Sequence, residues 1–213
     1  MKMLKRLSGP DRSALYREAY EIKSEIENGG LKEKMSAIYK KIAEGFENEY
    51  DEKYTKYISL YITLQTIYKS FHWLTRGTGY YGDHLLFDRL YDSLTEEIDF
   101  LAEKLISLFG RECVNPINST KIVYTNLETI IGGFDVNCNP SELVAIALYF
   151  EILFLEINNE FYKMLQEGEK TMGLDDLIMS NHSAHENNLY LLKSRFSVES
   201  LAEKNGVENE RVD

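Results

Sequence analysis

Apolar side chains recur at every third or fourth position along several long stretches of the chain, and this spacing limits the possible folds more than any other feature. The clearest stretch follows residue 50 and contains Tyr57, Leu60, Tyr61, Leu64, Tyr68 and Phe71. A repeat near 3.6 residues places such side chains on one face of an α-helix. Since no segment alternates apolar and polar residues as a half-buried strand does, the sequence predicts an all-α protein.

Glycines, prolines and capping residues mark where the helices begin and end. We predict four long helices: from about residue 50 to the loop at Gly77, from a cap at Asp83 to Phe109, from a cap at Asn139 to about Glu169, and from about Asp175 to Phe196. The connection over 111–139 is expected to hold only a short helix, around Leu127 to Ile131. Four long helices with one long connection favour a four-helix bundle with a crossover.

The two ends of the chain differ from its middle. Residues 13–49 hold two amphipathic stretches on either side of Gly29-Gly30, so residues 1–49 are predicted to be an N-terminal helical extension that packs outside the bundle. Residues 50–196 then form the bundle domain, and residues 197–213 form an acidic C-terminal tail.

Composition excludes several classes of protein. With 44% hydrophobic residues the chain can form a core, and with only Cys113 and Cys138 it is not a disulfide scaffold, so free thiols are expected. The most apolar run, Leu143 to Ile157, contains two glutamates and is shorter than the about 20 residues of a membrane span. The basic N-terminus lacks the apolar stretch of a secretory signal, so we predict a cytoplasmic protein without membrane contact.

Potential metal ligands are concentrated in the middle of the chain. On the second long helix they are His84, Asp88, Asp99 and Glu103, and a further histidine, His72, lies at the end of the preceding helix. An α-helix turns by about 100° per residue, so these four side chains all project within an arc of about 100° and form one stripe along the helix. The solvated face of a helix also forms a polar stripe, but the residues between these four are mostly apolar.

The length of this helix prevents all four residues of one chain from binding the same metal ion. Asp88 and Asp99 lie about 16 Å apart along the helix axis, whereas a ligand atom lies about 2 Å from its metal. Two antiparallel copies of the helix can supply one site if a two-fold axis passes near Ser93 and Leu94, where the small side chain of Ser93 allows close approach. His84 and Asp88 of one chain then lie opposite Asp99 and Glu103 of the other. Nitrogen and carboxylate ligands without sulfur suit iron, manganese or zinc.

The segment 71–110 resembles the Dps-type mini-ferritins, the DNA-binding proteins from starved cells, and a weaker likeness extends over about 50–196. The residues that match the family pattern are His72, Trp73, Gly77, Tyr80, His84, Asp88, Asp99, Ala102 and Glu103. The chain departs from the family at Leu74-Thr75, at Lys104 and in the length of residues 1–49. None of these departures removes a ligand.

The resemblance implies a ferritin-like four-helix subunit and a hollow dodecamer built from two-fold dimers. It also implies a ferroxidase that oxidises iron(II), with hydrogen peroxide preferred over dioxygen, and stores the ferric mineral inside. The site, holding one or two irons, would take its ligands from His72, His84 and Asp88 of one chain and from Asp99 and Glu103 of its partner.

Other residues allow two interpretations each. Trp73 is either an interface aromatic or, as the resemblance implies, an electron donor beside the iron. Asp175 and Asp176 stabilise the start of a helix, or they line an acidic iron-entry pore of the kind that Dps-type cages have. His182, His185 and Glu186 form either a second group of potential metal ligands or part of a solvated helix face.

DNA binding is the weakest prediction, because the net charge is −11. The basic residues that would contact DNA lie at the N-terminus and are Lys2, Lys5, Arg6 and Arg12. Two alternatives to an iron-storing ferroxidase therefore remain. One is a DNA-compacting protein with secondary iron chemistry, and the other is a structural cage.

Overall fold

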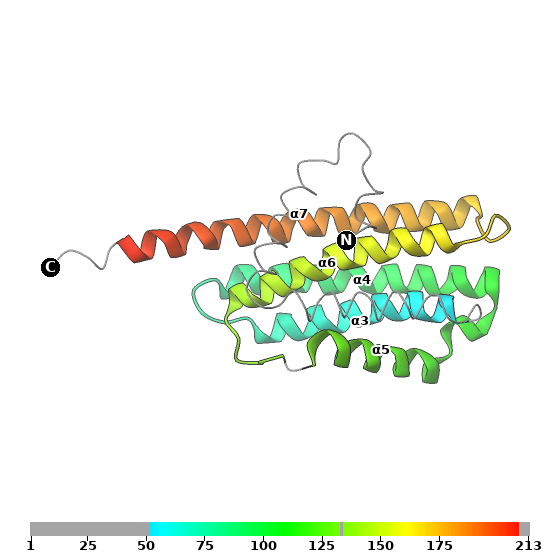
Figure 1. Ribbon diagram of the computed structural model, residues 1–213, viewed down its shortest axis with the longest axis horizontal. Coiled ribbons are helices and arrows are strands. Elements are labelled where there is room, and N and C mark those ends of the chain that lie inside the picture. The colour runs from blue at the N-terminus through cyan, green and yellow to red at the C-terminus, as the bar shows by residue number, and fades with distance from the viewer. Residues whose placement is uncertain (1–51, 133, 209–213) are drawn as a thin grey trace, which may run out of the picture.

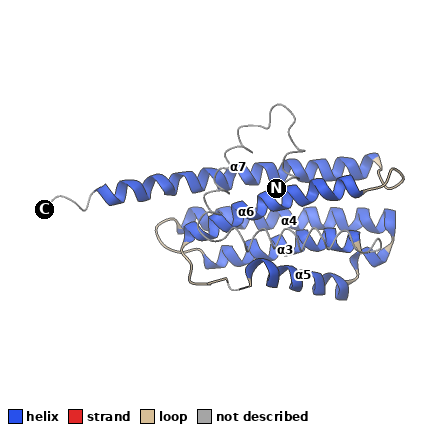
Figure 2. Cartoon of the chain, viewed as in Figure 1, coloured by secondary structure: helices blue, strands red, loops and turns tan. Residues whose placement is uncertain are grey.

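The computed structural model describes residues 52–132 and 134–208, with side chains described up to residue 196. Within these ranges the chain forms five α-helices and one short 3₁₀-helix, and no strand (Figure 2). The all-α prediction is confirmed. The predicted extension 1–49, with the basic residues Lys2, Lys5, Arg6 and Arg12, lies outside the described residues.

Four long helices form a bundle, and a fifth lies along its side. The bundle helices are α3 (Lys53–Leu74), α4 (Tyr80–Phe109), α6 (Pro140–Met164) and α7 (Met172–Glu208). The connection between α4 and α6 contains the 3₁₀-helix η3 (Arg111–Val114) and α5 (Pro116–Ile131), which packs against α3. Figure 1 shows α6 and α7 as a pair stacked on α3 and α4, with α5 on the outer side of α3. The arrangement is consistent with a ferritin-like bundle with a long crossover.

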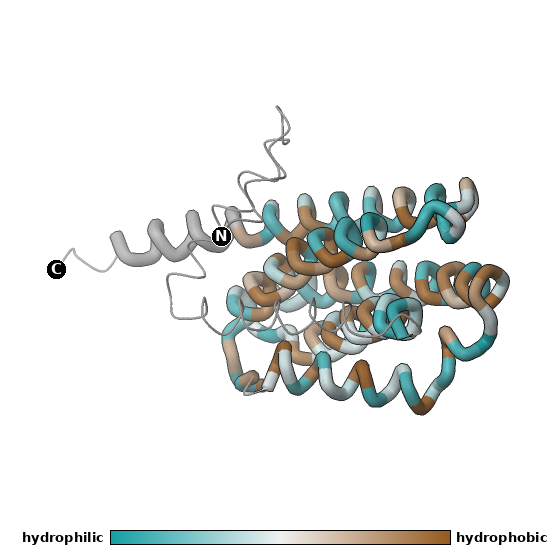
Figure 3. Tube along the Cα trace, turned by 45° about the vertical axis from the view of Figure 1, so that its right-hand side comes forward, coloured by the Kyte–Doolittle hydropathy of each residue, from teal (hydrophilic) through white to brown (hydrophobic). Residues whose placement is uncertain are grey.

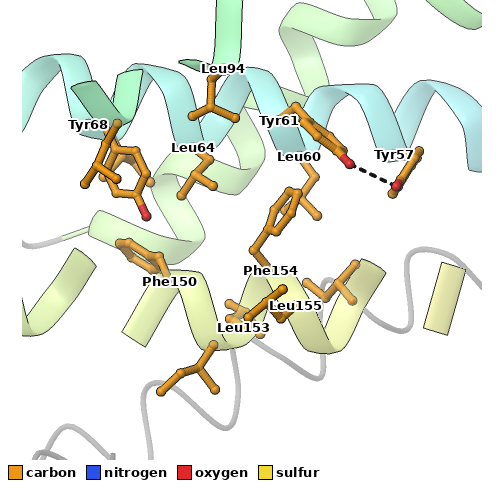
Figure 4. Packing of buried hydrophobic residues seen from close by; sticks show 14 of the residues in the cluster. Tyr57, Leu60, Tyr61, Leu64, Tyr68, Leu94, Phe150, Leu153, Phe154 and Leu155 are labelled. Carbon is orange, nitrogen blue, oxygen red and sulfur yellow. Dashed lines mark hydrogen bonds between the residues drawn. The ribbon is translucent and has the colours of Figure 1, made fainter. Parts of the chain in front are cut away.

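The core lies between the two helix pairs and is rich in aromatic rings. Hydrophobic and hydrophilic positions alternate along the helices of the tube in Figure 3, as expected for amphipathic helices. Figure 4 shows side chains of α3 packed against Phe150 and Phe154 of α6, and the rings of Tyr57 and Phe161 stack with centroids 3.6 Å apart. Every residue from Ala147 to Leu155 of α6 is buried. Helix α6 is therefore the central hydrophobic element of the bundle.

Several predicted helix ends were correct because their signals are local. Helix α4 ends at Gly110, whose φ of 93° is a conformation that glycine adopts without strain. Helix α6 begins with a capping box, in which Asn139 accepts from the backbone N–H of Glu142 and Glu142 accepts from that of Asn139. Both cysteines are free thiols, as predicted.

Four predicted boundaries were wrong. Helix α4 begins at Tyr80, and Asp83 is not its cap but a fully buried partner of Arg195 on α7, with Nε and Oδ1 2.5 Å apart. Helix α6 ends at Met164, because Glu169 turns back to bind Lys53 on α3, with 2.7 Å between Nζ and Oε1. Helix α7 begins three residues before Asp175 and continues to Glu208, into the predicted tail.

The crossover is more ordered than the sequence analysis predicted. Helix α5 has 16 residues instead of the short turn around Leu127 to Ile131. Asn115 caps it by accepting from the backbone N–H groups of Ile117 and Asn118, and Pro116 occupies its first turn. This is the same Asn-Pro signal that marks the start of α6, so the sequence contains the start of α5 as well.

None of the helices in the described part of the chain is both long and apolar enough to cross a membrane.

Candidate metal centre

The turn between α3 and α4 brings His72 and His84 face to face. Nδ1 of His72 lies 3.0 Å from the backbone oxygen of His84, and Nδ1 of His84 lies 3.0 Å from the backbone oxygen of His72. The two rings stack with centroids 3.7 Å apart and an angle of 26° between their planes. Since a carbonyl oxygen only accepts, both Nδ1 atoms carry the proton, and the Nε2 lone pair of each ring is left to bind a metal.

Asp88 is the third potential ligand that the fold brings to this place. It lies one helical turn beyond His84, and its Oδ1 is 3.9 Å from Nδ1 of His72. Its side chain is 49% exposed, so its oxygens can be reached from outside the bundle. A hydrogen bond to Asp88 raises the pKa of the neighbouring Tyr91. The phenol therefore stays protonated and donates to the carboxylate.

Asp99 and Glu103 are the two predicted ligands that one chain does not bring to the histidines. They lie on the same helix as His84, further toward its C-terminus, and both are exposed. Among the described residues of one chain, no group of three or more His, Cys, Asp or Glu side chains is arranged to hold a metal ion. A single chain thus presents two histidines and one carboxylate at one place and two carboxylates at another.

The predicted crossing point on α4 lies at Ser93 and Leu94. Ser93 is half-buried and donates to the backbone oxygen of Leu90, and the next residue, Leu94, is fully buried in the chain's own core. The contact would lie between two copies of the chain, so the small side chain at the crossing stays a prediction. The exposed residues at this level of the helix are Asp92, Thr95 and Glu96, two of which are acidic.

A second polar cluster lies inside the bundle and joins all four of its helices. His185 of α7 is fully buried, with Nδ1 2.6 Å from Oε2 of Glu151 on α6 and Nε2 3.1 Å from Oε2 of Glu97 on α4. The other oxygen of Glu151, Oε1, accepts from the hydroxyl of Tyr68 on α3 at 2.7 Å. Because carboxylates occupy both ring nitrogens, His185 offers no lone pair to a metal.

This cluster corrects the interpretation of His185 as part of a metal group or a solvated face with its neighbours on α7. His182 is half-buried and lies 3.2 Å from the amide nitrogen of Asn158, and its Nε2 is 3.9 Å from Glu186. One sequence signal pointed to the cluster. Glu151 interrupts the most apolar run of the chain, and a charge in such a run needs a buried partner.

His185 should make the stability of the protein depend on pH. Burial lowers the pKa of His185, but Glu151 and then Glu97 outweigh this effect and raise it from 6.5 to about 10. Such a group stabilises the fold fully below its unfolded pKa and loses this effect as pH rises through its folded pKa. We expect the free energy of unfolding to decline between pH 6.5 and about pH 10 in chemical denaturation series. An equal decline in a His185→Gln variant would contradict this origin.

The remaining predicted site residues lie at the surface or near it. Trp73 is 67% exposed beside the candidate site, and the ammonium group of Lys69 is 5.8 Å from its ring centroid. Asp176 is exposed in the first turns of α7, while one carboxylate oxygen of Asp175 is buried without a hydrogen-bond partner among the described residues. A pore between subunits would involve several chains, and the role of these aspartates in it stays a prediction.

Comparison with known proteins gives one relevant similarity. General stress protein 20U of Bacillus subtilis (strain 168), a Dps-family protein, is 27% identical to this chain over 127 residues. The matched part is 59% of this chain and 81% of that protein. No model of a known protein family matches the chain, and no solved structure matches it. The similarity is distant.

Proposed function

We propose that this protein is a mini-ferritin, which oxidises iron(II) at sites shared between two copies of the chain and stores the ferric product. The main support is the pair of reciprocal hydrogen bonds between His72 and His84. These bonds fix both imidazoles in the tautomer that binds a metal, at the positions where the sequence motif expects ligands. Packing alone does not require two stacked histidines beside an exposed carboxylate.

In this proposal a pair of chains forms two sites, and each chain contributes a different set of ligands to each of them. His72, His84 and Asp88 bind iron(II), and the exposed carboxylates Asp99 and Glu103 of a second copy complete the coordination. Carboxylate ligands favour the ferric product because they offset its higher charge. The site also holds iron beside the oxidant, hydrogen peroxide or dioxygen, which lowers the entropic cost of their meeting.

The charge on α4 supports a link between metal binding and pairing. Its outer face carries Asp88, Asp92, Glu96, Asp99 and Glu103, so two facing copies of the helix would repel one another. Iron(II) bound between the copies offsets this repulsion, and each process then favours the other. The larger assembly, which we propose to be a dodecamer with acidic pores near Asp175 and Asp176, would be built from these pairs.

Ferrous oxidation assays test this proposal. Iron(II) is added anaerobically to the full-length protein, hydrogen peroxide or dioxygen follows, and the ferric product is measured by absorbance while native mass spectrometry reports the assembly. We expect fast oxidation by the wild type and its loss in His84→Ala, because one of the two histidine ligands is missing. His182→Ala is the matched control and should keep the wild-type rate. A His84→Ala variant as fast as the wild type would favour a structural cage instead.

A further inference from the structure

Tyr68 occupies an unusual place among the buried tyrosines. It is fully buried on α3, one helical turn before His72 and therefore about 6 Å from it along the axis. Its hydroxyl donates to Glu151, a buried carboxylate whose other oxygen is held by His185. Oxidation of a phenol releases a proton as well as an electron, so a phenol bonded to a fixed carboxylate has an acceptor for that proton already in position.

We propose that Tyr68 is a reversible one-electron donor to the iron site, with Glu151 as the acceptor of its phenolic proton. This inference rests on the function proposed above and extends it. The glutamate keeps the proton within the bundle, at 2.7 Å from the phenol oxygen, so that it returns when the tyrosine is reduced again.

The chemistry balances over one peroxide and two ferrous ions. The first iron(II) gives one electron to hydrogen peroxide, which breaks the O–O bond and yields iron(III), hydroxide and a hydroxyl radical. Tyr68 gives one electron to that radical, forming a second hydroxide, and gives its proton to Glu151. The second iron(II) then returns an electron to the tyrosyl radical, and Glu151 returns the proton. The sum is two iron(III) and two hydroxide ions, with the protein unchanged.

Tyr57 and Trp73 lack such a proton acceptor, and the half-buried Tyr91 donates to Asp88, a carboxylate that the proposed site uses as an iron ligand. Tyr57 donates to the neutral amide oxygen of Asn158, and its hydroxyl lies 3.0 Å from that of Tyr61 (Figure 4). Neither an amide oxygen nor a second phenol takes up a proton as a carboxylate does. Trp73 would form a radical cation on oxidation, which the ammonium group of Lys69 near its ring disfavours.

Freeze-quench electron paramagnetic resonance tests the inference on the full-length protein. Samples loaded with iron(II) are mixed with hydrogen peroxide, and the tyrosyl signal and the ferric absorbance are recorded from the same mixtures. We expect the signal to be lost in Tyr68→Phe and retained in Tyr57→Phe, the matched control, which is equally buried on the same helix. A spin trap in solution should capture more hydroxyl radical from Tyr68→Phe than from the wild type or the control.

A second measurement leaves the phenol in place and so avoids any loss of folding. Incorporation of 3,5-difluorotyrosine at residue 68 should add fluorine hyperfine splitting to the signal, and incorporation at residue 57 should leave it unchanged. An unsplit signal from the protein labelled at residue 68, or ferrous oxidation in the wild type without any tyrosyl signal, would overturn the role of Tyr68 alone. Absence of ferrous oxidation in the wild type would overturn the proposed function and this inference together.

Discussion

Replacing His185 with glutamine is expected to lower the free energy of unfolding by about 3–5 kcal/mol, the usual effect of removing one partner from a buried ion pair. The protonated imidazole lies between Glu97 and Glu151, at 3.1 Å and 2.6 Å, in a part of the core that solvent does not reach. Without it, two carboxylates face one another with no positive charge between them. Chemical denaturation at fixed protein concentration measures the change.

Two further variants show whether the effect arises from uncompensated charge. His182→Gln, three residues earlier on α7, removes a half-buried histidine and should change stability by less than about 1 kcal/mol. Replacing Glu97, Glu151 and His185 together with leucine should recover most of the loss, because no buried charge then remains. A His185→Gln variant as stable as the wild type would mean that the cluster contains no ion pair in the folded protein.

The parts of the fold that the sequence predicted depend on local signals. The periodic stripe of α3 and the Asn139 cap of α6 are each read from a few neighbouring residues, and each lies where it was expected. The turn between α3 and α4 is also local, so the proximity of His72, His84 and Asp88 follows from the sequence. The length of α5 was predictable too, because Asn115 and Pro116 provide the same signal as the start of α6.

The parts that were missed depend on contacts between residues far apart in the chain. Asp83 satisfies every local criterion for a helix cap, and only the arrival of Arg195 from α7 explains its burial. His185 likewise looked like part of a polar helix face, because its two partners come from α4 and α6. Such pairings are set by how the helices pack, which periodicity does not determine.

The shared site makes a specific prediction for mixtures of inactive variants. His84→Ala and Asp99→Ala should each lose fast iron oxidation, since every site in either homodimer lacks a ligand. In a mixed dimer, one site lacks both residues and the other lacks neither. A 1:1 mixture with full subunit exchange should therefore recover about a quarter of the wild-type sites, because half of its dimers are mixed and each has one intact site.

The most direct test of the account compares this mixture with a second one, of His84→Ala and Asp88→Ala. Both of those residues belong to the same half of the site, so their mixed dimers contain no intact site and should stay inactive. Ferrous oxidation is measured after native mass spectrometry has confirmed exchange in both mixtures. The account predicts recovery with His84→Ala and Asp99→Ala only. No recovery in that mixture, or equal recovery in both, would contradict a site built from two chains.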